Sequence, residues 1–170
     1  PVRQQNAPHA LRFPYNQRWL LLVWRALYFR PNVYAASPTQ SAEWNHGAYL
    51  VEGLGHCNAC HQPRNALGAT QASNKPAGGV VLGWYAPALD ARPEAGTAHW
   101  SQADVVSLLQ TGMSQSAATL GPMGEVVFES LQHWQADDLQ ATASYLRAMP
   151  DRHVAPTPQS SISNAAAQRR

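Results

Sequence analysis

Two cysteines and a histidine in the run Cys57-Asn58-Ala59-Cys60-His61 constrain the chain more than any other feature. Their spacing is C-x-x-C-H, the attachment signature of a c-type haem. Residues three and four apart share one face of a helix, so two thiols can bond the vinyl groups on one side of a porphyrin while the adjoining imidazole reaches the iron. We therefore predict one covalently attached haem c, held by Cys57 and Cys60, with His61 as the proximal iron ligand.

Other uses of the two thiols fit the sequence less well. Cys57 and Cys60 are the only cysteines, which excludes a disulfide framework with other parts of the chain. A zinc site needs four ligands, and only His46, His56 and His61 lie near enough in sequence to complete one, so zinc stays a weaker alternative. A thioredoxin-like redox site is disfavoured because no Val- and Ile-rich strand flanks the motif.

The motif also predicts a compartment. Bacterial c-type haem is attached outside the cytoplasm, so we expect a periplasmic protein, with the outer face of the inner membrane as the narrower expectation. No signal peptide is visible, and Pro1 is therefore expected to be a mature or trimmed start. The formal net charge is +2, and the basic residues form no block of the kind that binds nucleic acid.

Composition divides the chain into three parts. Residues 1–40 should hold an extended arm and a helix, residues 41–150 the haem domain, and residues 151–170 a flexible tail. The first helix is expected over Tyr15–Phe29, where apolar side chains crowd together, and it is too short and too charged to span a bilayer, which takes about 20 apolar residues. We favour packing of this helix on the haem domain or a neighbouring domain over docking to a partner or a membrane surface.

The haem domain has helical patterns and no clear strand pattern. A helix from the N-cap Ser41 to about Glu52 would bury one face, and Gly47 within it indicates close contact with another helix. Further helices are expected at about 101–110 and 137–149. The long loops between them need something to pack against, such as a haem. The predicted class is all-α, with long haem-wrapping loops and an N-terminal extension helix. Candidates for the pocket wall are Trp84, Tyr85, Pro87 and Leu89.

The second axial position on the iron decides between electron transfer and substrate chemistry. Met123 is the favoured ligand, because we expect Gly121-Pro122-Met123-Gly124 to be a rigid loop that holds the sulfur outside a regular helix. Met113, which follows a helix-stop glycine, is the weaker alternative, and Met149 is expected to belong to the core. The histidines with weaker cases are His46, His56, His99 and His133.

Several longer motifs carry a family resemblance. The run from Ser41 to Gly68 resembles the membrane-associated, multi-haem cytochrome c subunits of bacterial alcohol, gluconate and aldehyde dehydrogenases. Further similar segments are Phe13-Pro-Tyr-Asn16, Gly83-Trp-Tyr-Ala-Pro87 and Gly121-Pro-Met-Gly-Glu-Val-Val127. Together the similarity covers about residues 12 to 150.

The resemblance implies a class I cytochrome c fold and electron transfer from a dehydrogenase towards quinone or a terminal oxidase. Carried over residue by residue, it gives His61 and Met123 as the axial iron ligands. Pro63, just after the proximal ligand, is expected to offer its carbonyl to the His61 ring N–H. Arg64 is expected to neutralise a haem propionate.

Three departures from the family pattern matter. Its members usually carry three C-x-x-C-H motifs, whereas this chain has one and looks like the middle of such a protein. Gln135 stands where a Ser or Thr helix cap is usual, which predicts a less firmly capped last helix. Gly124 replaces a more usual Ala and predicts a looser ligand loop.

The leading hypothesis is a non-catalytic electron carrier that serves a periplasmic or membrane-associated dehydrogenase and a downstream acceptor. An alternative is a haem enzyme or gas-binding sensor with an open or weakly held sixth position, for which His99 or Arg92 could act as the distal group. A third, compatible role is structural, with the N-terminal helix anchoring the haem domain in a larger oxidoreductase.

Overall fold

The computed structural model of the chain describes residues 3–71, 78–89 and 97–149. These residues form two compact units, which divide between Val33 and Tyr34. The expected C-terminal tail, residues 151–170, lies outside the described residues.

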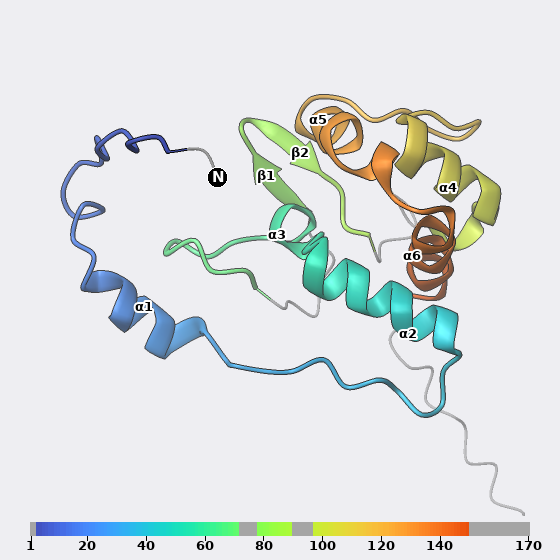
Figure 1. Cartoon of the computed structure of the whole chain (residues 1–170), viewed down its shortest axis with the longest axis horizontal. Helices are drawn as coiled ribbons and strands as arrows, with labels where there is room; N and C mark the ends of the chain where they lie inside the picture. Colours follow the sequence, from blue (N-terminus) through green and yellow to red (C-terminus); the bar gives the residue numbers. More distant parts are fainter. Residues whose placement is uncertain (1–2, 72–77, 90–96, 150–170) are drawn as a thin grey trace, which may run out of the picture. The chain divides into compact units, whose positions relative to one another are not determined.

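The N-terminal unit contains the helix α1, at Leu20–Tyr28 (Figure 1). It is shorter than the predicted Tyr15–Phe29 helix, because hydrogen bonds from Gln17 N to Pro14 O and from Leu20 N to Gln17 O close separate turns at 3.0 and 3.1 Å. None of the nine helical residues is buried, although most of them are apolar. Across the described ranges, no helix combines the length and apolar character needed to cross a membrane.

The second unit is built mainly from helices, as predicted (Figure 1). Helices α2 and α6 pack against each other, and α4 also packs on α6. Along the described part of this unit the elements are α2 (Ala42–Tyr49), a π-helical turn (Leu50–Leu54), α3 (Asn58–His61), β1 (Gly79–Val81), β2 (Trp84–Ala86), a 3₁₀ turn (Thr97–His99), α4 (Gln102–Thr111), α5 (Pro122–Glu129), a second 3₁₀ turn (Leu131–His133) and α6 (Ala136–Ala148).

The hydrophobic core lies where α2, α4 and α6 meet. Its most deeply buried large side chains are Val51, Val105 and Leu139. The indole of Trp44 meets the ring of Tyr145 edge to face, with 4.9 Å between the ring centroids. The predicted inner face of the first helix of this unit therefore packs as expected, although its last turn is π-helical rather than α-helical.

Gly47 marks the point at which α2 approaches α6. A methyl group built on its Cα would lie 2.6 Å from the carbonyl carbon of Ala141 and 2.8 Å from Cβ of Tyr145. Carbon atoms in contact lie about 3.5–4.0 Å apart, so only glycine permits this approach. The predicted role of Gly47 in helix contact is confirmed.

Serine side chains cap the starts of α2 and α4, and the cap at Ser41 is the predicted one. Ser41 Oγ accepts a hydrogen bond from Trp44 N at 3.1 Å, and Ser101 Oγ accepts one from Asp104 N at 3.0 Å. Gly112 ends α4 with a φ of +77°, which favours glycine. Gln135 occupies the N-cap of α6 and makes no side-chain capping bond, as its departure from Ser or Thr predicts.

The expectation of no strand is wrong for one short segment. β1 and β2 form an antiparallel hairpin in which Val81 pairs with Trp84. Leu82 and Gly83 make the turn with φ values of +50° and +82°, as in tight two-residue hairpins. Each strand has three residues, too few for an alternating pattern to be visible in the sequence.

Candidate haem-binding site

The C-x-x-C-H motif forms the predicted single turn of helix. Cys57 is the N-cap of α3, and its carbonyl accepts hydrogen bonds from Cys60 N at 3.1 Å and from His61 N at 3.0 Å. A hydrogen bond from Cys57 N to Val51 O at 3.1 Å joins the preceding π-helical turn to α3. Between them, the backbone changes direction at His56, which has a φ of +36°. π-Helical turns occur often at functional sites.

The imidazole of His61 is oriented by a backbone carbonyl. Its Nδ1 lies 2.6 Å from the carbonyl oxygen of Pro87. A carbonyl can only accept, so Nδ1 carries the hydrogen and Nε2 keeps a free lone pair, the form a metal requires. Burial lowers the pKa of His61, against a smaller opposing effect of the Pro87 bond, and so favours the neutral ring.

The prediction that the Pro63 carbonyl accepts the hydrogen bond of the His61 ring is wrong. The Pro63 carbonyl accepts a hydrogen bond from Gln71 N at 2.8 Å and serves the loop after the motif. Pro87 lies 26 residues beyond His61 and reaches it only through the fold. No local spacing in the sequence signals such a contact.

The two thiols have different surroundings. Cys57 packs against the hydrophobic core, and burial raises the pKa of its thiol. Cys60 lines a cavity together with His61. Both cysteines are free of disulfide bonds.

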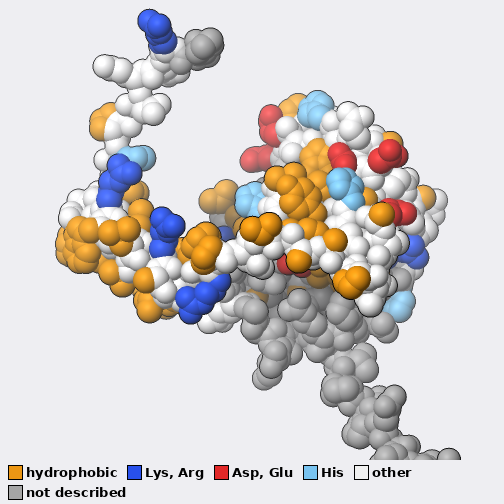
Figure 2. Space-filling view, turned by 60° about the horizontal axis from the view of Figure 1, so that its bottom comes forward, with side chains coloured by type: hydrophobic (Ala, Val, Ile, Leu, Met, Phe, Trp, Pro, Cys, Tyr) orange, Lys and Arg blue, Asp and Glu red, His pale blue; other side chains and the backbone are white. Residues whose placement is uncertain are grey.

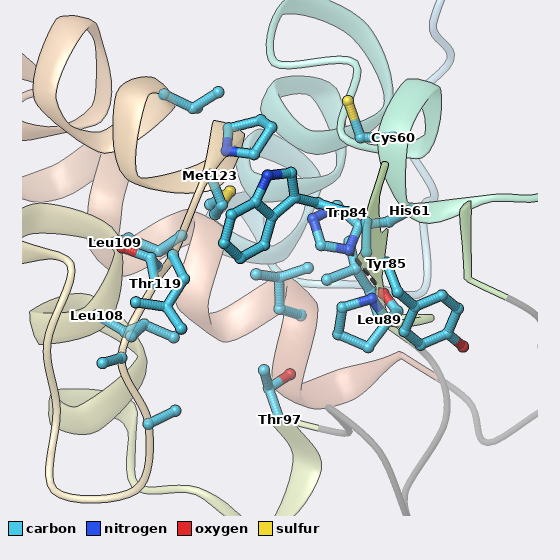
Figure 3. A pocket seen from close by; sticks show the side chains of 18 of the residues that line it. Cys60, His61, Trp84, Tyr85, Leu89, Thr97, Leu108, Leu109, Thr119 and Met123 are labelled. Atoms are coloured by element: carbon cyan, nitrogen blue, oxygen red, sulfur yellow. Dashed lines mark hydrogen bonds between the residues drawn. The ribbon is translucent and has the colours of Figure 1, made fainter. Parts of the chain in front are cut away.

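That cavity has a volume of about 370 Å³ (Figure 3), within the range of roughly 300–1,000 Å³ typical of cofactor sites. Its lining is predominantly apolar, as expected for a site that takes the faces of a porphyrin. The predicted pocket-wall residues Trp84, Tyr85, Pro87 and Leu89 all line it. Sequence reasoning missed other lining residues, among them Thr97, Leu108, Leu109, Thr119, Leu120 and Val126.

Met123 lines the same cavity as His61, and Met113 does not. Met113 is 66% exposed, and Met149 packs against the hydrophobic core as expected. The expectation that Met123 lies in a loop is wrong, because Pro122 begins α5 and places Met123 in its first turn. Proline fits the first position of a helix, where its missing N–H costs nothing. The role of Met123 as iron ligand stays a prediction.

Arg64 is engaged by its own loop. Its guanidinium donates to the carbonyl of Gly68 at 2.8 Å and to that of Ala59 at 2.7 Å. Neither Arg64 nor Pro63 lines the cavity. The guanidinium therefore holds the chain after the motif in place, and its contact with a propionate stays a prediction.

Thr97 supports the fit of a haem in the cavity. Its side chain is 6% exposed and lines the cavity, and within the described residues its Oγ1 has no hydrogen-bond partner. A buried hydroxyl without a partner costs about 1–3 kcal/mol. A cofactor that brings polar groups into an otherwise apolar cavity, such as a haem with its propionates, would remove that cost.

The four histidines with weaker cases as iron ligands do not line the cavity. His46 Nε2 pairs with the carboxylate of Asp138 at 2.6 Å and joins α2 to α6. His56 Nδ1 lies 2.5 Å from the carbonyl of Gly55 beside it. His99 and His133 end short 3₁₀ turns. In the described segments, no three His, Cys, Asp or Glu side chains gather to hold a metal ion, so the zinc alternative gains no support.

No protein-family model matches the sequence. Among curated proteins, a nicotinate dehydrogenase subunit of Pseudomonas putida is 44% identical in an alignment that covers 99% of this chain and 14% of the relative. The cytochrome c subunit of alcohol dehydrogenase (quinone) from Gluconobacter oxydans is 38% identical, and the alignment covers 88% of this chain and 33% of the relative. The cytochrome c subunit of gluconate 2-dehydrogenase from Pantoea cypripedii is 36% identical, and the alignment covers 92% of this chain and 38% of the relative.

These relatives are longer than the chain, which spans between 14% and 38% of their length. The region matched by the Pseudomonas putida relative covers 99% of the chain, so it spans the C-x-x-C-H motif and the helices around the cavity. The chain is homologous over most of its length to the cytochrome c subunits of bacterial alcohol and gluconate dehydrogenases, and it is a c-type cytochrome domain.

Proposed function

We propose that the chain is a single-haem electron-transfer domain that passes electrons one at a time, with His61 and Met123 as the two axial ligands of a haem c bound to Cys57 and Cys60. The observation that carries this proposal is the placement of His61 and Met123 on one apolar cavity. An iron with both axial positions filled has no site for substrate. Electron transfer is the chemistry that remains.

When bound, the haem supplies a one-electron couple of its iron, with a potential set by the axial ligands and the surroundings. The chain's residues prepare that site. The Pro87 carbonyl orients the neutral imidazole of His61, and the lining of the cavity is predominantly apolar. A thioether ligand from Met123 would raise the reduction potential.

The proposed partners are a dehydrogenase subunit, which supplies electrons, and an acceptor further along the respiratory chain. The names of the relatives support this role, since two of them are cytochrome c subunits of dehydrogenases. The relatives differ in the substrate that their names give, so no substrate is assigned to the partner of this chain. The proposed location is the periplasm, where c-type haem is attached.

The exposed apolar side chains of α1, in the N-terminal unit, fit a contact with another domain or subunit (Figure 2). Leu21, Leu22 and Leu27 are each at least 57% exposed within a helix of nine residues. Apolar side chains gathered in this way usually mark an interaction site. We therefore propose residues 1–40 as a docking or packing segment and residues 41–150 as the cytochrome domain.

The alternative of an open sixth position finds less support. His99 is exposed and does not line the cavity. Arg92 lies outside the described residues. Met123 lines the cavity together with His61, and a methionine thioether is an established axial ligand of haem iron.

The test is optical spectroscopy of Met123→Ala with Met113→Ala as the matched control. Ferric haem with a methionine ligand has a sulfur-to-iron charge-transfer band in the far red. We expect Met123→Ala to abolish the band and to let the ferrous haem bind carbon monoxide, while Met113→Ala retains the wild-type spectrum. A far-red band that survives in Met123→Ala would refute the ligand assignment.

A further inference from the structure

We infer that Trp84 is a positioning residue for the distal ligand: its indole packs on Gly121 and fixes the start of the helix that carries Met123. This inference rests on the proposed function, in which Met123 ligates the iron. Trp84 lines the haem cavity, and in its positioning role it would act on the iron through Gly121 and Met123.

The first observation is the close contact between the indole and Gly121. A methyl group built on Gly121 would lie 2.5 Å from Cδ2 and 2.6 Å from Cε2 of Trp84. The indole therefore covers the Cα of Gly121 where a side chain would otherwise stand. Trp84 and Met123 also line the same cavity, and in Figure 3 the indole lies between Met123 and His61 as the cavity is viewed.

The second observation is the position of Gly121 in α5. Its carbonyl accepts hydrogen bonds from Gly124 N at 2.9 Å and from Glu125 N at 3.4 Å, so this residue sets the first turn of the helix. Its φ of +54° favours glycine, and no side chain caps the helix at this end. Because Met123 lies in that first turn, a shift of Gly121 moves the thioether with it.

The third observation is that the hairpin is anchored to the proximal side of the site. Three residues after Trp84, the Pro87 carbonyl accepts the hydrogen bond of the His61 ring. In β1, a methyl group on Gly79 would lie 2.7 Å from the carbonyl oxygen of Gln62, directly after the motif. The hairpin thus joins the C-x-x-C-H turn to the Met123 helix.

A role in ordinary core packing does not account for this tryptophan. Trp84 is 51% exposed and is absent from the hydrophobic core cluster. A half-exposed indole stacked on a glycine contributes little core burial. It does restrict the ways in which the Gly121 backbone can move.

The experiment compares Trp84→Leu, Trp84→Phe and the control Phe128→Leu in the haem-loaded full chain. Phe128 is an exposed aromatic residue on the same α5 helix and does not line the cavity. The probe is imidazole, which binds ferric haem only when the thioether leaves the iron. Easier opening of the Met123 turn raises the apparent imidazole affinity, because a larger fraction of the protein is competent to bind.

We expect Trp84→Leu to weaken the far-red band and to raise the imidazole affinity about tenfold, equal to about 1.4 kcal/mol of easier opening. Trp84→Phe should fall between this variant and wild type, since a smaller ring still covers Gly121. Phe128→Leu should match wild type. If Trp84→Leu fails to incorporate haem, Trp84→Phe decides by the same measurement.

An imidazole affinity for both Trp84 variants within about twofold of wild type, less than about 0.5 kcal/mol, would overturn the inference. Met123→Ala is measured alongside to separate the positioning role from the ligand assignment. If that variant loses the far-red band while the Trp84 variants behave as wild type, the positioning role fails and the electron-transfer proposal stands. If Met123→Ala keeps the band, the ligand assignment fails, and the positioning role fails with it.

Discussion

Replacing Gly47 with alanine tests the helix contact on which the domain is built. The new methyl group would lie 2.6 Å from the carbonyl carbon of Ala141 and 2.8 Å from Cβ of Tyr145, about 1 Å inside carbon–carbon contact distance. These are backbone and Cβ atoms, which no side-chain rotation can move away. Helices α2 and α6 must therefore separate for the variant to fold.

The size of the effect follows from two opposing terms. Overpacking of this kind costs about 1–3 kcal/mol, and a clash with backbone belongs at the upper end. Alanine in place of glycine within a helix returns about 0.5–1 kcal/mol. The net loss in the free energy of unfolding is then about 2 kcal/mol, or about 8 °C in Tm for a domain of this size.

The assay is thermal and denaturant unfolding of the haem-loaded protein, with Gly124→Ala as the matched control. Gly124 also lies in a helix, but the nearest atom to its added methyl group is the Thr119 carbonyl oxygen at 4.0 Å. That variant should gain about 0.5–1 kcal/mol. Equal stabilities of the two variants, or a Gly47→Ala protein at least as stable as wild type, would refute the packing argument.

Three further changes test separate contacts. Tyr145→Phe removes the hydrogen bond from Tyr145 Oη to the Glu52 carboxylate at 2.6 Å. The free energy of unfolding should fall by about 1–3 kcal/mol, because the acceptor is a carboxylate and the pair is partly buried. Denaturant unfolding measures this change, and an unchanged midpoint would contradict it. Gln135→Ser should add about 0.5–1 kcal/mol by capping α6, which has no side-chain cap, and a lower Tm would show that the serine does not cap. In Arg64→Lys, the lysine ammonium cannot donate to the Gly68 and Ala59 carbonyls with the geometry of a guanidinium. We therefore expect faster amide hydrogen exchange in residues 62–71 and no change in α6. Exchange equal to that of wild type in residues 62–71 would show that Arg64 does not hold this loop in place.

Features with a local physical cause could be predicted from the sequence. The Ser41 and Ser101 caps, the helix stop at Gly112 and the buried faces of α2 and α6 depend on residues within one or two turns of each other. The role of Gly47 also follows from local reasoning, because glycine in a helix is costly unless something approaches it closely. The same holds for the motif turn at Cys57.

Features that depend on distant contacts could not be predicted. The Pro87 carbonyl reaches His61 only after the chain has folded back. Proximity in the sequence therefore favours Pro63, and that prediction is wrong. The hairpin strands are too short for a period to be visible. The segment at Gly121 has the composition of a turn, yet Pro122 serves as the first residue of α5.

The measurement that tests the central claim most directly is an optical redox titration of the wild-type protein, followed by exposure of the reduced form to carbon monoxide. We predict a single one-electron transition, a far-red band in the ferric state and a ferrous spectrum that carbon monoxide leaves unchanged, because the proposed ligands His61 and Met123 would fill both axial positions. A high-spin ferric spectrum without that band, together with rapid carbon monoxide binding, would contradict the electron-carrier assignment and establish an open sixth position.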